Sequence, residues 1–212
     1  MTGRPARLDR SFFDRDTLLV CRELLGKKLV RTDDRGRRCS GLVIEAEAYI
    51  GTEDVGCHAH AGRTARNASM WGPPGHAYVY FTYGMHWMLN FVTERDGFPA
   101  AVLIRGVAPV EGLRSMRRRR RGRRVSDLTN GPAKLCQAFR IDKRFDGHDL
   151  CQEDSLLFVE KRPRVPAQAV ETGPRVGLDP VPEPWKSMPW RFRVRSEYVR
   201  YLVSREGSDE LA

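Results

Sequence analysis

Two glutamates and a tyrosine stand at every second position at the start of the stretch EAEAYIGTEDVGCHAH, residues 45–60. If this stretch is a strand, Glu45, Glu47 and Tyr49 share one face, because the side chains of a strand alternate between its two faces. Carboxylates that share a half-buried face oppose each other's ionisation, which raises one pKa towards the range of a general base. The alternative is a structural patch in which arginines neutralise the carboxylates. The spacing does not choose between these interpretations, nor between Glu45 and Glu47 as the base.

The same stretch continues with Cys57, His58 and His60, three side chains that can bind a metal ion. Their spacing matches no standard zinc signature, and no second pair of ligands accompanies them. We therefore expect no metal and no cofactor, and a histidine that forms hydrogen bonds instead.

A second cluster, YVYFTYGM at residues 78–85, is rich in tyrosine. Tyr78 and Tyr80 fall on one face of a predicted strand, and Tyr83 directly precedes Gly84, which suits a hairpin tip. An aromatic side chain at such a tip can wedge between the base steps of a nucleic acid, and tyrosines on a sheet can stack on a flat base. The alternative is a tyrosine-rich strand packed in a core.

The chain is basic, with a net charge of +10 and a pI near 9.8. Seven arginines within residues 117–124 carry most of this excess, and without them the net charge is +3. A basic balance favours a polyanionic partner, with nucleic acid ahead of an anionic membrane surface. The arginine run itself fits a solvated loop with non-specific phosphate affinity, and a nuclear localisation patch is a further interpretation.

Nothing in the sequence indicates a membrane or secreted protein. No window approaches the roughly 18 apolar residues of a spanning helix. The charged stretch MTGRPARLDRSFFDRDTLL has no apolar segment of the kind found in signal peptides. The five cysteines are widely spread and form no CxxC pair, as expected in a reducing compartment. We expect an intracellular protein with no membrane partner.

The elements that must position these residues follow from apolar spacing and turn residues. A helix capped by Asp14 and ended by Gly26 precedes strands at about 28–32 and 41–49. Residues 51–75 form a long loop, and loops of this length are often functional. Three antiparallel strands follow as a meander, and their expected ranges are 76–83, 86–93 and 100–106.

In the second half, one helix is expected after Pro109 and runs into the arginine run. A second helix starts near Pro132, with Asn130 or Gly131 as its cap. Short strands in SLLFVEK and WRFRVR and a tail after about residue 205 complete the chain. No composition shift marks a domain boundary, so we expect residues 1–212 to form one α+β domain with a mixed or antiparallel sheet.

Several blocks, in their order and spacing, resemble the alkyladenine (3-methyladenine) DNA glycosylase family, the mammalian-type methylpurine-DNA glycosylases that lack a helix-hairpin-helix motif. The blocks are VIEAEAYIGTEDVGCHA, RNASMWGPPGHAYVYFTYGMHWMLN, AAVLIRGVAPVEGLRSMR, NGPAKLCQAFRI and RVG. The similarity runs from about Leu18 to about Arg195. It implies a single compact α+β domain with a curved, mostly antiparallel sheet, flanking helices and a protruding β-hairpin.

The resemblance also implies an activity: a monofunctional DNA glycosylase that rotates alkylated or otherwise damaged purines out of double-stranded DNA. Such an enzyme hydrolyses the N-glycosidic bond and starts base excision repair, as a monomer and without a cofactor. Glu47 is then the base that activates water, and Glu45 supports it. Arg105 contacts a phosphate or orients Glu47, and Tyr83 takes the place of the extruded nucleotide.

The remaining matched residues surround the base or contact the DNA backbone. Tyr49 and Tyr80 are expected to stack on the extruded base, His58 to form a hydrogen bond near it, and Asn90 to influence which purines fit. The candidate phosphate contacts are Arg66, Lys134, Arg117, Arg118, Arg119, Arg120 and Arg121.

This chain departs from the family pattern in two places. RTARN is one residue shorter than in the mammalian form, which affects the loop contacts there, and the arginine run at 117–124 is peculiar to this chain. Three alternatives stay open: a non-catalytic basic nucleic-acid-binding module, a metal-dependent hydrolase, and a glycosylase for a different lesion. A lyase needs an amine nucleophile, and Lys134 and Lys143 lie far from EAEAY in the sequence.

Overall fold

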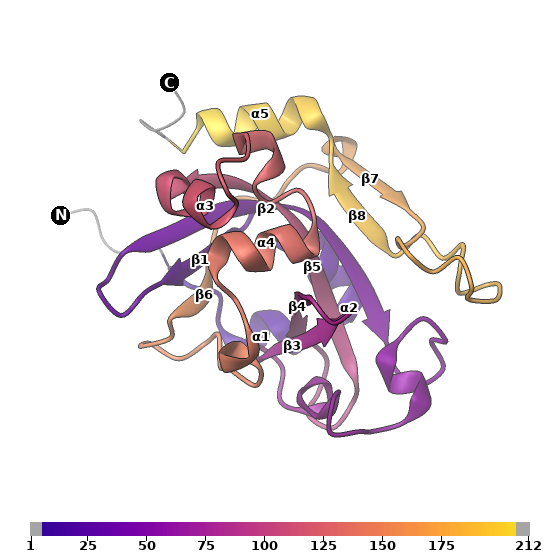
Figure 1. Ribbon diagram of the computed structural model, residues 1–212. Helices are drawn as coiled ribbons and strands as arrows, with labels where there is room; N and C mark the ends of the chain where they lie inside the picture. Colours follow the sequence, from indigo (N-terminus) through magenta and orange to yellow (C-terminus); the bar gives the residue numbers. More distant parts are fainter. Residues whose placement is uncertain (1–5, 207–212) are drawn as a thin grey trace.

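The strand β2 (Arg38–Ile50) organises the sheet (Figure 1). In the computed structural model, which describes residues 6–206, its first part pairs with β1 (Lys28–Thr32) and its later part with β8 (Arg191–Val194). Its other edge pairs with β5 (Ala100–Glu111) over nearly its whole length. The register to β5 shifts on both sides of Glu45, and such bulges bend a strand and re-aim its side chains.

The strand order is β3-β4-β5-β2-β1-β6, with β7 and β8 branching from β2. Every pairing between these strands is antiparallel, which confirms the predicted α+β fold and its antiparallel sheet. The strands not yet delimited are β3 (Ala77–Thr82), β4 (His86–Val92), β6 (Leu157–Glu160) and β7 (Val170–Gly173).

Helices cover both faces of this sheet. They are α1 (Arg10–Phe13), α2 (Thr17–Leu24), α3 (Leu113–Arg119), α4 (Pro132–Phe139) and α5 (Ser196–Ser204). In Figure 1, α4 lies in front of the sheet and α2 behind it, while α5 crosses the top. Contacts agree, because α2 packs on β2 and β5, α4 packs on β4 and β5, and α3 packs on α4.

Three apolar clusters among the described residues hold these layers together, and the third, built on Leu42, Ala108 and Val110, packs against α5. The main core joins the helices to the sheet through large side chains with no solvent exposure, among them Phe13, Leu24, Phe91, Ile104 and Phe139. A smaller cluster lies under the loop of residues 51–75 and is built on Cys57, Ala59, Met70, Tyr78, Val92 and Ala101. The long loop is therefore packed onto the sheet, and two short 3₁₀ turns, His58–Ala61 and Ala68–Trp71, give it regular structure.

Several predicted boundaries were wrong in detail. Asp16, not Asp14, caps α2, because its carboxylate accepts a hydrogen bond from the Leu19 amide at 2.8 Å. Pro109 stays within β5, and α3 begins only after Gly112. Of the two predicted caps of α4, Gly131 is confirmed as the N-cap, without a side-chain bond.

Three elements, α1, β7 and α5, were not predicted. The helix α5 occupies most of the segment between WRFRVR and the expected tail. Nearly all of the tail predicted after residue 205 lies outside the described residues. Within them, no helix is long and apolar enough to cross a membrane.

Candidate active site

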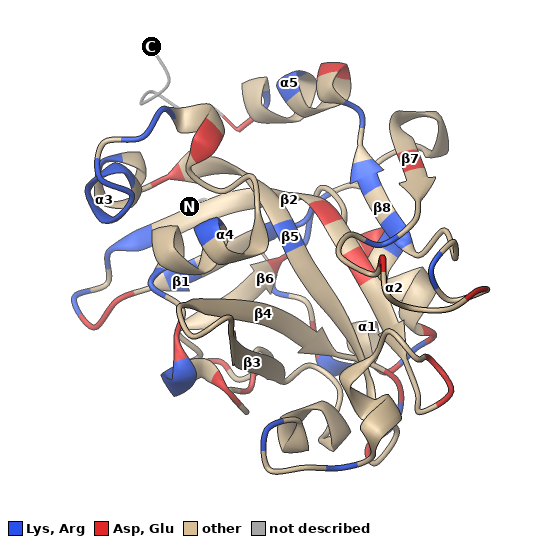
Figure 2. Cartoon of the chain, turned by 45° about the vertical axis from the view of Figure 1, so that its right-hand side comes forward, with Lys and Arg blue, Asp and Glu red and all other residues tan. Residues whose placement is uncertain are grey.

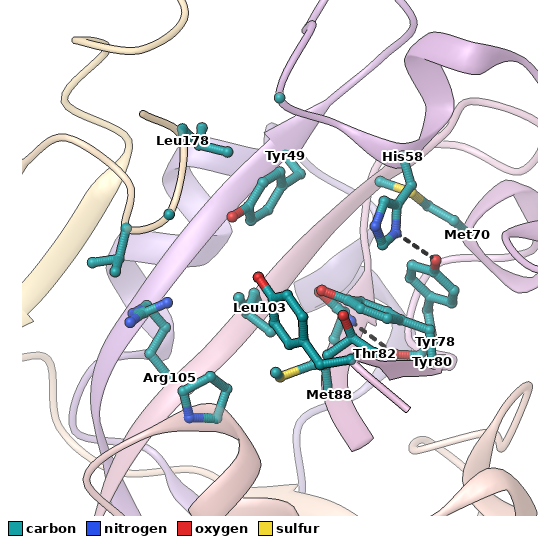
Figure 3. Close-up of a pocket in the computed structure, with 16 residues that line it drawn as sticks. Tyr49, His58, Met70, Tyr78, Tyr80, Thr82, Met88, Leu103, Arg105 and Leu178 are labelled. Atoms are coloured by element: carbon teal, nitrogen blue, oxygen red, sulfur yellow. Dashed lines mark hydrogen bonds between the residues drawn. The ribbon is translucent and has the colours of Figure 1, made fainter. Parts of the chain in front are cut away.

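A cavity of about 330 Å³, lined in part by four tyrosines and a histidine, opens beside the end of β2 (Figure 3). Its volume lies at the small end of the range of ligand sites, about 300–1,000 Å³. The loop after β2, the β3–β4 hairpin, β5, the start of α4 and the segment 176–178 complete its wall. Six of the predicted site residues line it: Tyr49, His58, Tyr80, Tyr83, Asn90 and Arg105.

Glu47 lies directly behind this wall and has no solvent exposure. Its Oε1 accepts a hydrogen bond from the Val176 amide at 2.7 Å, and its Oε2 accepts one from the Tyr49 hydroxyl at 3.0 Å. Arg105 reaches both oxygens, with Nε 3.3 Å from Oε1 and Nη1 3.4 Å from Oε2. Three cavity-lining residues therefore connect a buried carboxylate to the cavity.

Burial raises the pKa of Glu47, and Arg105, the Val176 amide and the Tyr49 hydroxyl act against that rise. The charge of Glu45 also raises it, in the predicted direction, but as the smallest of these causes. The predicted effect of the neighbouring carboxylate is therefore present, but burial, which the spacing alone did not indicate, is the larger cause. A carboxylate with a raised pKa that still has a cationic partner suits a general base.

Glu45 faces the same guanidinium but is partly exposed. Arg105 Nε lies 3.0 Å from its Oε1, and Arg191 Nη1, on the neighbouring strand, lies 3.5 Å from the same atom. Because Arg105 touches both glutamates, the predicted shared face is confirmed. The structural-patch interpretation describes Glu45 well, whereas Glu47 is the carboxylate beside the aromatic cavity.

A histidine and two tyrosines form the opposite wall. His58 Nδ1 lies 2.8 Å from the Tyr78 hydroxyl, a contact drawn as a dashed line between the two labelled residues in Figure 3. The ring centroids of His58 and Tyr80 are 4.5 Å apart, and those of Tyr78 and Tyr80 are 5.3 Å apart. Burial raises the pKa of Tyr80 to about 12 and, with the charge of Arg66, lowers the pKa of His58. The rings are thus uncharged at neutral pH.

The loop that carries His58 is fixed by the buried Asn67. Its side-chain amide donates to the carbonyls of His58 at 3.0 Å and Gly62 at 2.9 Å. Its Oδ1 accepts from the Thr64 amide at 2.7 Å. A loop fixed by hydrogen bonds in this way holds the His58 ring in the cavity wall more accurately than a free loop would.

Two side chains of the CHAH stretch form hydrogen bonds within the loop. Cys57 Sγ accepts from the Ala59 amide at 3.5 Å, and His60 Nδ1 lies 2.8 Å from the Thr52 carbonyl. Within residues 6–206, no three histidine, cysteine or acidic side chains come together in a way that could hold a metal ion.

Asn90 and Tyr83 mark the two ends of the hairpin wall. Asn90 is buried on β4, and its amide donates to the Tyr78 carbonyl at 3.0 Å. Tyr83 lies at the tip, is 82% exposed, and has a φ of 51°, followed by Gly84 at 65°. The tip is closed by a 3.2 Å bond from the Met85 amide to the Thr82 carbonyl. The predicted exposed aromatic tip is confirmed.

Among the candidate phosphate contacts, the five arginines of residues 117–121 divide into exposed side chains and side chains bonded to α4. Arg117, Arg118 and Arg121 are exposed on α3 and the turn after it, a largely blue region in Figure 2. Arg119 and Arg120 bond to α4, through the Ala138 carbonyl at 2.7 Å and Gln137 Oε1 at 2.6 Å.

The other two candidates lie closer to the cavity. Arg66 is exposed, with its guanidinium carbon 5.5 Å from the Tyr80 ring centroid and Nη2 3.2 Å from the Phe81 carbonyl. Lys134 follows the cavity-lining Pro132 and is held by Asp127 and by Asn130 Oδ1 at 2.9 Å.

Three further residues of the site were not predicted. Val176 supplies the amide on Glu47, and Arg175 and Asp54 form a buried ion pair next to Tyr49. The RVG block held two of them, but nothing in the local pattern connects that block with EAEAY, which lies more than 120 residues earlier.

Comparison with known proteins points to one family. The model of the family described as methylpurine-DNA glycosylase (MPG) matches residues 11–198. A Methanocella arvoryzae protein named for 3-methyladenine DNA glycosylase activity is 48% identical over 186 residues, covering 87% of this chain and 90% of its own. Proteins with the same name from Chlorobaculum parvum and Desulfitobacterium hafniense are 42% and 43% identical, and each alignment covers 91% of this chain and at least 90% of the relative.

Proposed function

The chain belongs to the methylpurine-DNA glycosylase family and is a DNA glycosylase, and on that premise we propose that Glu47 activates the water that cleaves the N-glycosidic bond of a damaged purine. The observation that carries the proposal is the position of Glu47. It is a buried carboxylate with a raised pKa, joined by hydrogen bonds to the wall of an aromatic cavity.

The first step is extrusion of the nucleotide. The bond between sugar and base is inaccessible inside a stacked duplex, so the nucleotide has to rotate out. Tyr83 is suited to occupy the gap, because its exposed ring at a tight turn loses little packing when it inserts between bases. Exposed arginines such as Arg66, Arg117 and Arg118 are suited to phosphate contacts.

The extruded base enters between aromatic rings. Tyr49 lies on one side of the cavity and Tyr80 and His58 on the other (Figure 3), so a flat purine can stack on uncharged rings. A purine alkylated at N3 or N7 is positively charged, and a cation over a π face gains about 0.5–2 kcal/mol. We propose N-alkylated purines in duplex DNA as the substrate class, with Asn90 at the inner edge of the base.

Glu47 then acts on the sugar. The departure of a cationic base leaves oxocarbenium character at the sugar, which a nearby carboxylate stabilises, and the same carboxylate takes a proton from the attacking water. Arg105 favours the ionised form that this role requires. Both carboxylate oxygens are already engaged, so a water reaches Glu47 only after Arg105 or Tyr49 shifts. Catalytic hydrogen bonds of free enzymes commonly rearrange in this way when substrate binds.

We propose a monofunctional enzyme that leaves an abasic site. A lyase needs an amine to form a Schiff base with the sugar, and no lysine lines the cavity in the described part of the chain. Borohydride is therefore expected to trap no covalent adduct between the protein and cleaved DNA. A trapped adduct would contradict the monofunctional mechanism.

The oligomeric state, the cofactor requirement and the compartment follow from the proposed substrate. A single lesion needs one cavity, so we propose a monomer that works without a metal or cofactor. The five cysteines are all free thiols, which fits a reducing intracellular compartment where DNA is found.

The test is single-turnover release of the base from a panel of duplexes that each contain one modified nucleotide. The proposal predicts release of 3-methyladenine and 7-methylguanine in the presence of a chelator, with no release of uracil. A chelator-sensitive activity supports a metal-dependent hydrolase instead. Release of uracil alone supports a glycosylase for another lesion, and binding without any release supports a non-catalytic module.

A further inference from the structure

A fully buried ion pair joins the two segments that enclose Glu47. Arg175, in the segment between β7 and β8, bonds to Asp54 in the loop after β2, with Nη1–Oδ2 and Nη2–Oδ1 distances of 2.5 Å and 2.8 Å. Both side chains have no solvent exposure. A bidentate pair of this geometry fixes both partners in position as well as in charge.

Each partner makes further bonds to the backbone around it. Arg175 donates to the carbonyls of Ala48 at 3.1 Å and Trp185 at 3.3 Å. Asp54 accepts from the amide of Gly56 at 3.0 Å and of Ile50 at 3.3 Å. The pair thus ties the end of β2 to the segment that continues into Val176.

The backbone approaches the pair closely at Gly56, which also lines the cavity. A Cβ at this position would lie 3.0 Å from Arg175 Nη2 and 2.7 Å from Leu178 Cδ1. The guanidinium is therefore packed against the cavity wall from behind, separated from the base site by one layer of residues.

That layer includes the Tyr49 ring. The guanidinium carbon of Arg175 lies over this ring at 4.7 Å from its centroid, and at 5.0 Å from the Trp190 centroid. Because Arg175 is buried and does not line the cavity, it covers the face of Tyr49 that a base cannot reach. A purine stacked on the other face is then about 8 Å from the guanidinium, since van der Waals contact between the rings adds roughly 3.5 Å.

This arrangement creates a charge problem for a cationic base. An unpaired guanidinium at that distance would repel a methylated purine and offset the cation–π attraction. Arginine cannot lose its proton in a protein, so only a counter-charge removes the repulsion. Asp54 supplies that counter-charge directly on the guanidinium.

We propose that the Asp54–Arg175 pair is a specificity-determining element: Arg175 positions Tyr49 and Val176 against Glu47, and Asp54 cancels its charge so that the cavity accepts cationic bases. This inference rests on the proposed function, because it assumes that the base stacks on Tyr49. Neither residue touches the reacting atoms, so both act through positioning and charge.

The test compares the binding of two lesions that differ in charge and closely match in shape. The probes are duplexes with 2′-fluoro-7-methyldeoxyguanosine, which is cationic and resists cleavage, and with 7-methyl-7-deazadeoxyguanosine, which is neutral. The readout is the ratio of the two dissociation constants. In Asp54→Asn the preference for the cationic probe is expected to fall roughly 10- to 30-fold, the factor for like charges about 8 Å apart at an effective dielectric constant of about 20–30.

Two further variants separate charge from structure. In Asp54→Asn/Arg175→Gln, which removes both charges, the ratio returns to the wild-type value, and in Arg175→Gln it rises above that value. Equal weakening of both probes in Asp54→Asn, as from a structural defect, overturns the inference. If Asp54→Asn does not fold, Arg175→Gln decides, because it leaves the Asp54 charge unopposed: a raised ratio in favour of the cationic probe supports the inference, and an unchanged or lowered ratio overturns it. A wild-type protein that prefers neither probe to undamaged duplex contradicts the proposed function instead.

Discussion

Replacing Tyr83 by glycine is expected to stabilise the protein while it impairs extrusion of the base. Tyr83 and Gly84 both have positive φ at the hairpin tip, as in type I′ turns, where asparagine and glycine are preferred. A residue other than glycine costs about 1–2 kcal/mol in the left-handed region. Glycine avoids this cost, but the larger conformational entropy that it loses on folding destabilises the folded state by about 0.5–1 kcal/mol. Since Tyr83 is 82% exposed, the variant loses little burial, and the free energy of unfolding should rise by up to about 1 kcal/mol.

The functional loss comes from the contacts that the ring makes only in DNA. A tyrosine buries about 150–250 Å² when enclosed, and most of that area is free at this tip. At about 25 cal/mol per Å² the inserted ring contributes roughly 3–5 kcal/mol, against an unstacking cost of a few kcal/mol. Removal of the ring should therefore lower the extruded population by about 10- to 100-fold, which corresponds to about 1.4–2.8 kcal/mol.

Thermal unfolding measures the stability, and the fluorescence of 2-aminopurine placed beside a 7-methylguanine reports unstacking. Tyr83→Phe is the matched control, because it keeps both the ring and the positive φ. It should resemble the wild type in both assays. The reasoning fails if Tyr83→Gly unfolds at a lower temperature than the wild type, or if it unstacks the duplex as well as Tyr83→Phe does.

Two further expectations concern charge. Arg105→Leu removes a cation that lowers the pKa of Glu47, so that pKa should rise further. Because the base must be ionised to act, the acid limb of the pH–rate profile should then move to higher pH. An acid limb that does not move in single-turnover measurements would count against the role of Arg105. Replacing the exposed Arg117, Arg118 and Arg121 by glutamine should weaken the salt dependence of DNA binding. The slope of log binding constant against log salt concentration should decrease in magnitude by up to about 2.7, because each lost phosphate contact accounts for about 0.9. Single-turnover cleavage should stay nearly unchanged. Collapse of cleavage would instead place the run within the active site.

The elements carrying the site were largely predictable from local pattern. Alternation along β2 predicted the common face of Glu45 and Glu47, and Tyr83 before Gly84 predicted an exposed aromatic tip. These predictions succeeded because each depends on the geometry of one strand or one turn. The spacing of Tyr198 and Leu202 also fits a helix, so α5 had a local signal that was overlooked.

The support behind Glu47 was not predictable. The Asp54–Arg175 pair joins residues 121 positions apart, and the bond from Val176 to Glu47 spans 129. Such contacts arise from the branching of the sheet at β8, which no local periodicity encodes. Burial, the largest cause of the raised pKa, was not predicted for the same reason, since it depends on how distant segments cover β2.

The most direct test of the role of Glu47 is the single-turnover rate at which the Glu47→Gln variant releases 7-methylguanine. The affinity of this variant for the same duplex is measured in parallel, and Glu45→Gln is the control. Burial raises the pKa of Glu47, so the ionised carboxylate destabilises the fold above that pKa, and the neutral glutamine should keep the protein folded at pH 7. We predict unchanged affinity and a rate lowered about 10²- to 10⁴-fold, the usual contribution of a general base, with a much smaller loss in Glu45→Gln. A folded Glu47→Gln protein that releases the base at the wild-type rate would contradict the assignment of Glu47 as the catalytic residue.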